Sequence, residues 1–207
     1  SEKTSSGSMR IYTENAGLAG TSGTINMSTG IANDIANTAG DINIITGKST
    51  VQRGGKIKLS VGDTTLGNGN DVQVTAGLTL SATSTGGKID ITAGFGGSLN
   101  KGAGGDVNIA GGASNADNTG APGGDVNMQA GASKASDSGN VFISSGHSTL
   151  ADSGSVIVQT YNSGTAGVSG SMLLQTGDSA SGTSGSISVN TGDSVSGHGG
   201  NIALSVG

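Results

Sequence analysis

A short apolar pattern recurs along the whole chain at nearly constant spacing, and this repeat constrains the fold more than any other feature. The pattern is a triplet of an apolar, a variable and an apolar residue. Thirteen copies begin, 15 to 19 positions apart, at Met9, Ile25, Ile42, Ile57, Val72, Ile89, Val107, Val126, Val141, Val156, Met172, Ile187 and Ile202. Self-similarity at a fixed period is the signature of repeat architectures. We therefore expect one structural unit to be repeated along residues 1–207.

The alternation within each triplet predicts a strand whose first and third residues point inward. About nine residues after each triplet begins comes a second small apolar residue, which we expect on a shorter strand of an opposite wall. These residues are Leu18, Val51, Leu66, Ala116, Ala135, Leu150 and Val195. The glycine that usually follows a triplet is expected to end the strand with a positive φ. The pattern thus predicts an all-β fold, a single parallel β-solenoid (β-helix or β-roll) of about thirteen coils.

Because of the composition, the repeat decides whether this chain can form an ordered fold. The 207 residues include 41 Gly, no Cys, no Trp, two Phe and two Tyr, so any core is thin. A chain this rich in small and polar residues otherwise reads as disordered. Only stacking of identical units would give each segment the same buried neighbours.

Charge and hydropathy exclude two classes of partner. The formal net charge is -5, and no cluster of Lys or Arg marks a surface for nucleic acid. No apolar stretch approaches the roughly 18 residues that a membrane-spanning helix needs. We therefore expect neither nucleic-acid binding nor a membrane span.

The residue before each triplet alternates in charge over part of the chain. Asp41, Lys56, Asp71 and Lys88 would form a charge ladder between adjacent coils, fixing their register. The like-charged neighbours Asp106 and Asp125, and also Asp178 and Asp193, are the candidate calcium ligands under a second interpretation, in which these pairs hold a metal. No other cofactor is expected. The run Gly67–Asp71 is similar to a calcium-binding nonapeptide, but it occurs once.

The central residues of the triplets are mostly polar, and we expect them to face solvent. Three consecutive triplets depart from this rule with Phe142, Ile157 and Leu173, and Tyr161 lies just beyond the second of them. Contiguous exposed apolar residues usually mark an interface. The alternative is an apolar surface without a partner.

Nothing in the sequence predicts catalysis. The two histidines, His147 and His198, are far apart in the repeat, and Ser and Asp are too abundant for a neighbouring one to be informative. We therefore expect a protein that is not an enzyme and has no catalytic residues.

Units such as Gly124–Met128, Ser184–Asp193 and Gly199–Gly207 resemble the secreted Gly/Ser/Asp-rich repeat proteins of diatoms and related algae. The resemblance covers nearly the whole chain and implies a secreted protein of the extracellular matrix or cell surface. It carries over no catalytic residue.

The leading hypothesis is a structural or adhesive scaffold rod. Because neither end of the chain has a polar cap, we expect a segment of a longer repeat protein or a subunit that self-associates, head to tail into filaments or laterally. The alternative is a repetitive-surface binder of the ice-binding type, which would need a flat wall of regularly spaced hydroxyls. The corresponding column contains Ser28, Ser60, Thr75 and Thr92 but is broken by Ile45.

Overall fold

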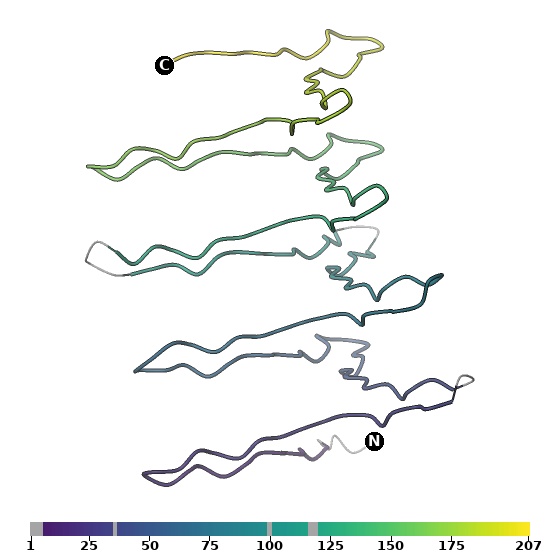
Figure 1. Ribbon diagram of the computed structural model, residues 1–207, viewed down its shortest axis with the longest axis vertical. Helices are drawn as coiled ribbons and strands as arrows, with labels where there is room; N and C mark the ends of the chain where they lie inside the picture. Colours follow the sequence, from purple (N-terminus) through teal and green to yellow (C-terminus); the bar gives the residue numbers. More distant parts are fainter. Residues whose placement is uncertain (1–5, 35–36, 99–100, 116–119) are drawn as a thin grey trace. The chain divides into compact units, whose positions relative to one another are not determined.

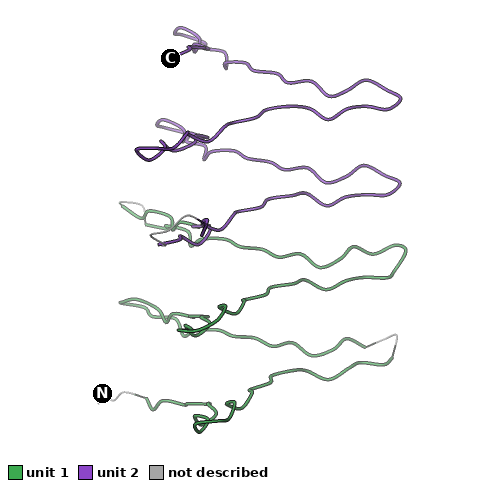
Figure 2. Ribbon diagram, turned by 60° about the vertical axis from the view of Figure 1, so that its left-hand side comes forward, with its two compact units in different colours: residues 1–107 green, residues 108–207 purple. Residues whose placement is uncertain are grey.

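The computed structural model describes residues 6–34, 37–98, 101–115 and 120–207. Two units can be distinguished, Ser1–Val107 and Asn108–Gly207, and each is considered by itself (Figure 2). Within each unit the chain reverses direction repeatedly at short turns and bends (Figure 1). Around the turn at Leu18 and Ala19, for example, the two flanking runs lie side by side, and Thr13 Oγ1 donates a hydrogen bond to Gly23 O at 3.1 Å.

The prediction of an all-β solenoid is wrong. The described residues contain no helix and no strand, and no sheet, barrel or solenoid is detected among them. A solenoid needs a ladder of backbone hydrogen bonds between neighbouring coils. The backbone hydrogen bonds of the described residues instead join groups 3 to 12 positions apart, within single turns and loops.

The expected thin interior is not formed either. None of the described residues is buried, and the chain exposes 21265 Å². A compact protein of this mass would expose roughly 8,600 Å² and a fully extended one roughly 28,600 Å². The residues around the triplets are mainly Gly, Ser, Thr and Ala, which bring little apolar area. That area is too small to offset the entropy lost on ordering a closed core.

The exposure of the triplet residues differs regularly between the first and the third position, but neither position faces an interior as predicted. From Ile25 onward the first residue of each triplet is 47 to 58% exposed, whereas the third is at least 64% exposed in every copy. The first position is thus partly covered by its surroundings. The third position, which was expected to point inward, lies largely open to solvent.

Local structure comes from loops that are closed at their base. In five loops, the glycine two residues before a triplet donates its backbone N–H to the carbonyl of the glycine that follows the preceding triplet. The pairs are Gly87 to Gly77 (2.9 Å), Gly105 to Gly94 (2.9 Å), Gly124 to Gly112 (2.8 Å), Gly139 to Gly131 (2.9 Å) and Gly154 to Gly146 (3.0 Å). We call the donor of each pair the stem glycine.

Several of the glycines two residues before a triplet approach the other side of the loop too closely for a larger residue. A Cβ placed on Gly87 would lie 3.0 Å from Gly77 N, and one on Gly55 would lie 2.8 Å from Thr46 Cβ. The same position holds glycine before every triplet except the one at Val72, where Asn70 stands. Close approach of two chain segments therefore explains Gly55, Gly87 and Gly124, whereas a Cβ on Gly40 or Gly105 would make only an ordinary contact.

The predicted role of the other glycine column is wrong. The glycines that follow the triplets were expected to have positive φ, but among the described glycines only Gly67 and Gly120 do. In five loops these glycines instead supply the carbonyl that the stem glycine binds.

The far side of many loops is shaped by a serine seven residues after the triplet begins. Its Oγ accepts a hydrogen bond from the backbone N–H three residues later, a serine turn. The five examples are Ser49 with Gln52 (3.0 Å), Ser133 with Ser136 (3.1 Å), Ser148 with Ala151 (3.0 Å), Ser179 with Gly182 (3.1 Å) and Ser194 with Gly197 (2.9 Å).

These bends also contain the residues that were assigned to a second wall, and that assignment is wrong. Val51 and Leu150 lie in bends and are 90% and 98% exposed. Leu18, Leu66, Ala135 and Val195 likewise lie in turns or bends and are exposed, and Ala116 lies outside the described residues. Small apolar residues here sit at loop tips, not on a strand.

Candidate functional site

The residues considered for catalysis and metal binding are not gathered into a site. His147 and His198 both lie in loops. In the described part of the chain, no group of three or more His, Cys, Asp or Glu side chains could hold a metal ion. Asp106, Asp125, Asp178 and Asp193 therefore do not belong to such a group, and calcium binding there stays a prediction.

The predicted charge ladder required stacked coils, and the described residues do not form them. Asp41, Lys56, Asp71 and Lys88 each precede a triplet, as the sequence shows, but no strands bring them into register in the described residues. The Lys88 Nζ atom pairs instead with Oδ2 of Asp90, the central residue of the triplet that follows it, at 2.7 Å. Both side chains are largely exposed, so this pair adds little stability.

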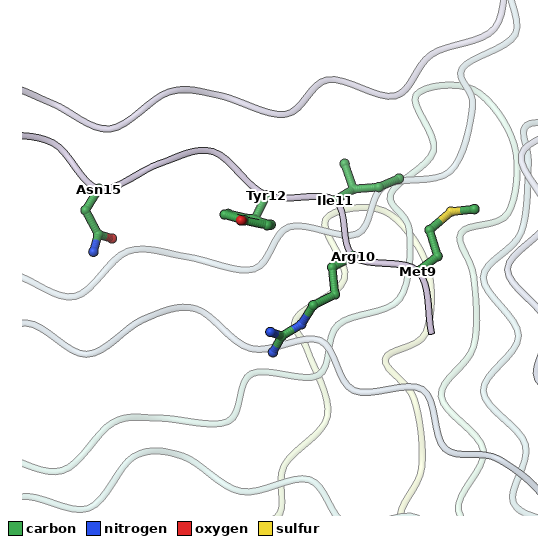
Figure 3. A pocket seen from close by; sticks show the side chains of 5 residues that line it. All are labelled: Met9, Arg10, Ile11, Tyr12 and Asn15. Atoms are coloured by element: carbon green, nitrogen blue, oxygen red, sulfur yellow. The ribbon is translucent and has the colours of Figure 1, made fainter. Parts of the chain in front are cut away.

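An open recess of about 800 Å³ lies at the first triplet, lined by Met9, Arg10, Ile11, Tyr12 and Asn15. Met9 and Ile11 lie on one side of the backbone, and Arg10 and Asn15 on the other (Figure 3). All five residues come from a single short segment. Ligand sites usually bring convergent groups from several segments into a concave wall, so this recess does not indicate one.

The strongest candidate is a set of exposed apolar residues in the second unit, which we call the apolar surface. Phe142, Ile157 and Leu173 occupy the centres of three consecutive triplets and are 76 to 88% exposed, and Tyr161 is 85% exposed. In each of these triplets the flanking residues are apolar as well, so all three positions present apolar side chains. That these four residues form an interface stays a prediction, and their side chains are exposed to a partner.

A charge pattern that the sequence analysis missed sets this surface apart. Residues 138–177 carry a single charged side chain, Asp152, counting His147 as neutral. The second unit has six Asp and one Lys, hence the whole formal net charge of -5, whereas residues 1–107 have eight acidic and eight basic residues. Counting charge over separate halves of the sequence would have revealed this pattern.

No family model, no curated protein and no solved structure matches the chain.

None of the described residues belongs to a helix long and apolar enough to cross a membrane.

Proposed function

We propose that this chain is a non-enzymatic structural or adhesive protein of the extracellular matrix or cell surface, and that it works by associating with further copies of itself. The observation that carries the proposal is the thirteenfold repetition of exposed apolar triplets, spaced by short loops. The apolar side chains of each triplet are about half or more exposed, and apolar area in water favours association.

Repetition strengthens such contacts. A single triplet buries too little area for a stable complex, because a specific interface usually buries at least about 1,200 Å². Once one triplet is in contact, the next is held nearby by a short loop, so its binding becomes intramolecular. Many weak and identical contacts then add up to cohesion without one dominant site.

The extracellular setting is supported by resemblance. The Gly-rich, Ser-rich units of the chain resemble those of secreted algal repeat proteins. The absence of a gathered catalytic or metal group in the described residues is compatible with a structural role but does not by itself support one.

Sedimentation velocity of the purified 207-residue chain over a hundredfold range of concentration tests the proposal. We expect the mean sedimentation coefficient to rise with concentration, and to rise further in ammonium sulfate, which strengthens apolar contacts. A chain that remains monomeric at the highest concentration in both buffers would contradict the proposed function.

A further inference from the structure

One segment of the apolar surface combines the properties of a self-association site. Residues Ser155–Tyr161 form a continuous run without a turn or bend, and in Figure 1 they lie in the green part of the chain that leads to the turn at residues 165 and 166. Five of the seven residues, namely Val156, Ile157, Val158, Thr160 and Tyr161, are β-branched or aromatic. The run contains no Gly, no Pro and no charge, which is the composition of segments that pair between chains.

The backbone groups of this run are not paired, although the chain that returns beyond the turn passes one side of it, where a Cβ on Gly170 would lie 3.4 Å from Thr160 Cγ2. Gly154 donates its N–H to Gly146 O just before the run, and Gly167 donates to Gly164 O just after it. Between these two closures, none of the backbone hydrogen bonds of the described structure involves residues 155–161. An extended segment with free N–H and C=O groups is a template for another extended segment.

We propose that residues 155–161 pair, in register and strand to strand, with the same residues of a second copy of this chain, and that this contact nucleates self-association. The pairing is formed between copies, not within one chain. This inference rests on the proposed function and names its site and its partner.

The lack of charge allows an identical partner. Each copy brings an uncharged run from a region with one charged residue in forty, so two copies meet without repulsion between like charges. In-register pairing also places identical side chains above each other. Alternation then puts Val156 and Val158 on one face and Ile157 and Tyr161 on the other, with Gln159 between them forming an amide ladder.

The test compares two lysine substitutions in the full chain. Ile157→Lys puts a charge at the centre of the proposed contact, where identical charges would stack about 4.8 Å apart. Asn127→Lys adds the same charge at the same position of another triplet in the same unit. We expect Ile157→Lys to raise the concentration at which association begins at least tenfold, and Asn127→Lys to change it less than twofold.

A direct measurement of register is available because the sequence has no Cys. A spin label on Gln159→Cys should show strong dipolar broadening in the associated state, and a label on Asn127→Cys should not. If the chain associates but both lysine variants behave alike, or the label at position 159 shows no broadening, this inference is wrong and the proposed function stands. If the wild-type chain does not associate at all, both are wrong.

Discussion

At the scale of single residues, space rather than conformation selects glycine at the base of several loops. Gly87 has no positive φ, yet a Cβ there would lie 3.0 Å from Gly77 N and 3.3 Å from Ala76 Cβ. Backbone atoms cannot rotate away as a side chain can. A glycine of this kind is needed for close approach, and it would tolerate no larger residue without a shift of the chain.

Replacing Gly87 by Ala should therefore open its loop. We expect Gly87→Ala to remove the hydrogen bond from residue 87 N to Gly77 O, and to speed amide exchange at residue 87 up to about tenfold, since one net hydrogen bond contributes about 0.5–1.5 kcal/mol. Exchange measured by NMR and corrected for the intrinsic rate of each residue type checks this.

The neighbouring glycine provides a matched control. A Cβ on Gly86 would lie 3.6 Å from Gly77 O, which is an ordinary contact. Gly86→Ala should leave the exchange at residue 87 within about twofold of the wild-type rate, a limit set by the small free energy involved. Equal acceleration in both variants would show that space at the stem does not decide the structure.

The sequence predicted where the triplets and the glycines lie, but the roles predicted for the third triplet residue and for the glycine after the triplet were wrong. The alternation of Ile57, Lys58 and Leu59 was visible, but their distribution between inside and outside depends on burial, and none of the described residues is buried. The glycines after the triplets were interpreted as positive-φ turn residues. Their actual role as carbonyl acceptors could not be found from residue type alone, because it depends on which segment approaches them.

At the scale of the loop, closure is insensitive to length. The same kind of glycine pair closes a short loop, from Gly131 to Gly139, and a loop half as long again, from Gly112 to Gly124. The entropy of loop closure grows only with the logarithm of length, so this difference costs about 0.4 kcal/mol. The variable spacing between successive triplets follows from this tolerance.

An insertion tests the argument. We expect Gly-Ser-Gly-Ser inserted after Lys134, in the bend of the loop between Gly131 and Gly139, to keep the bond from Gly139 N to Gly131 O. Amide exchange at Gly139 should then change less than about threefold. NMR exchange on the full chain measures it. Loss of all protection at Gly139 would mean that the serine turn at Ser133, not the glycine pair, holds the loop together.

The repeat itself was predictable from sequence, whereas the packing of one repeat against another was not. The nearly constant period gives the unit and its loops, and both are present in the structure. Stacking of units was inferred from the need to bury apolar residues. That need can also be met by other copies of the chain, and no pattern within one sequence distinguishes these two solutions. The candidate residues Phe142, Ile157 and Leu173 could be found from the sequence because they are apolar, whereas the central residues of the other triplets are mostly polar.

For the whole molecule, the main consequence concerns cooperativity. Cooperative unfolding requires a shared core whose loss exposes much surface at once. The described residues have no such core, and the exposed area of 21265 Å² already approaches that of an extended chain. Local loops should therefore open independently of each other.

We accordingly expect no cooperative heat-absorption peak in calorimetry of the dilute, monomeric chain. Circular dichroism followed during heating should change gradually, without a sigmoidal transition. A sharp peak, with an enthalpy near the roughly 0.7 kcal/mol per residue typical of globular proteins, would contradict the exposed arrangement of the triplets.

The closure of each loop by its own ends has a further consequence for how such a gene can change. Unequal recombination adds or deletes whole units, and in a globular protein such an event usually destroys the fold. Here a lost unit removes one glycine pair and leaves every other pair with both of its members. Copy number can therefore drift freely, and under the proposed function selection would adjust the strength of self-association by the number of units in the chain.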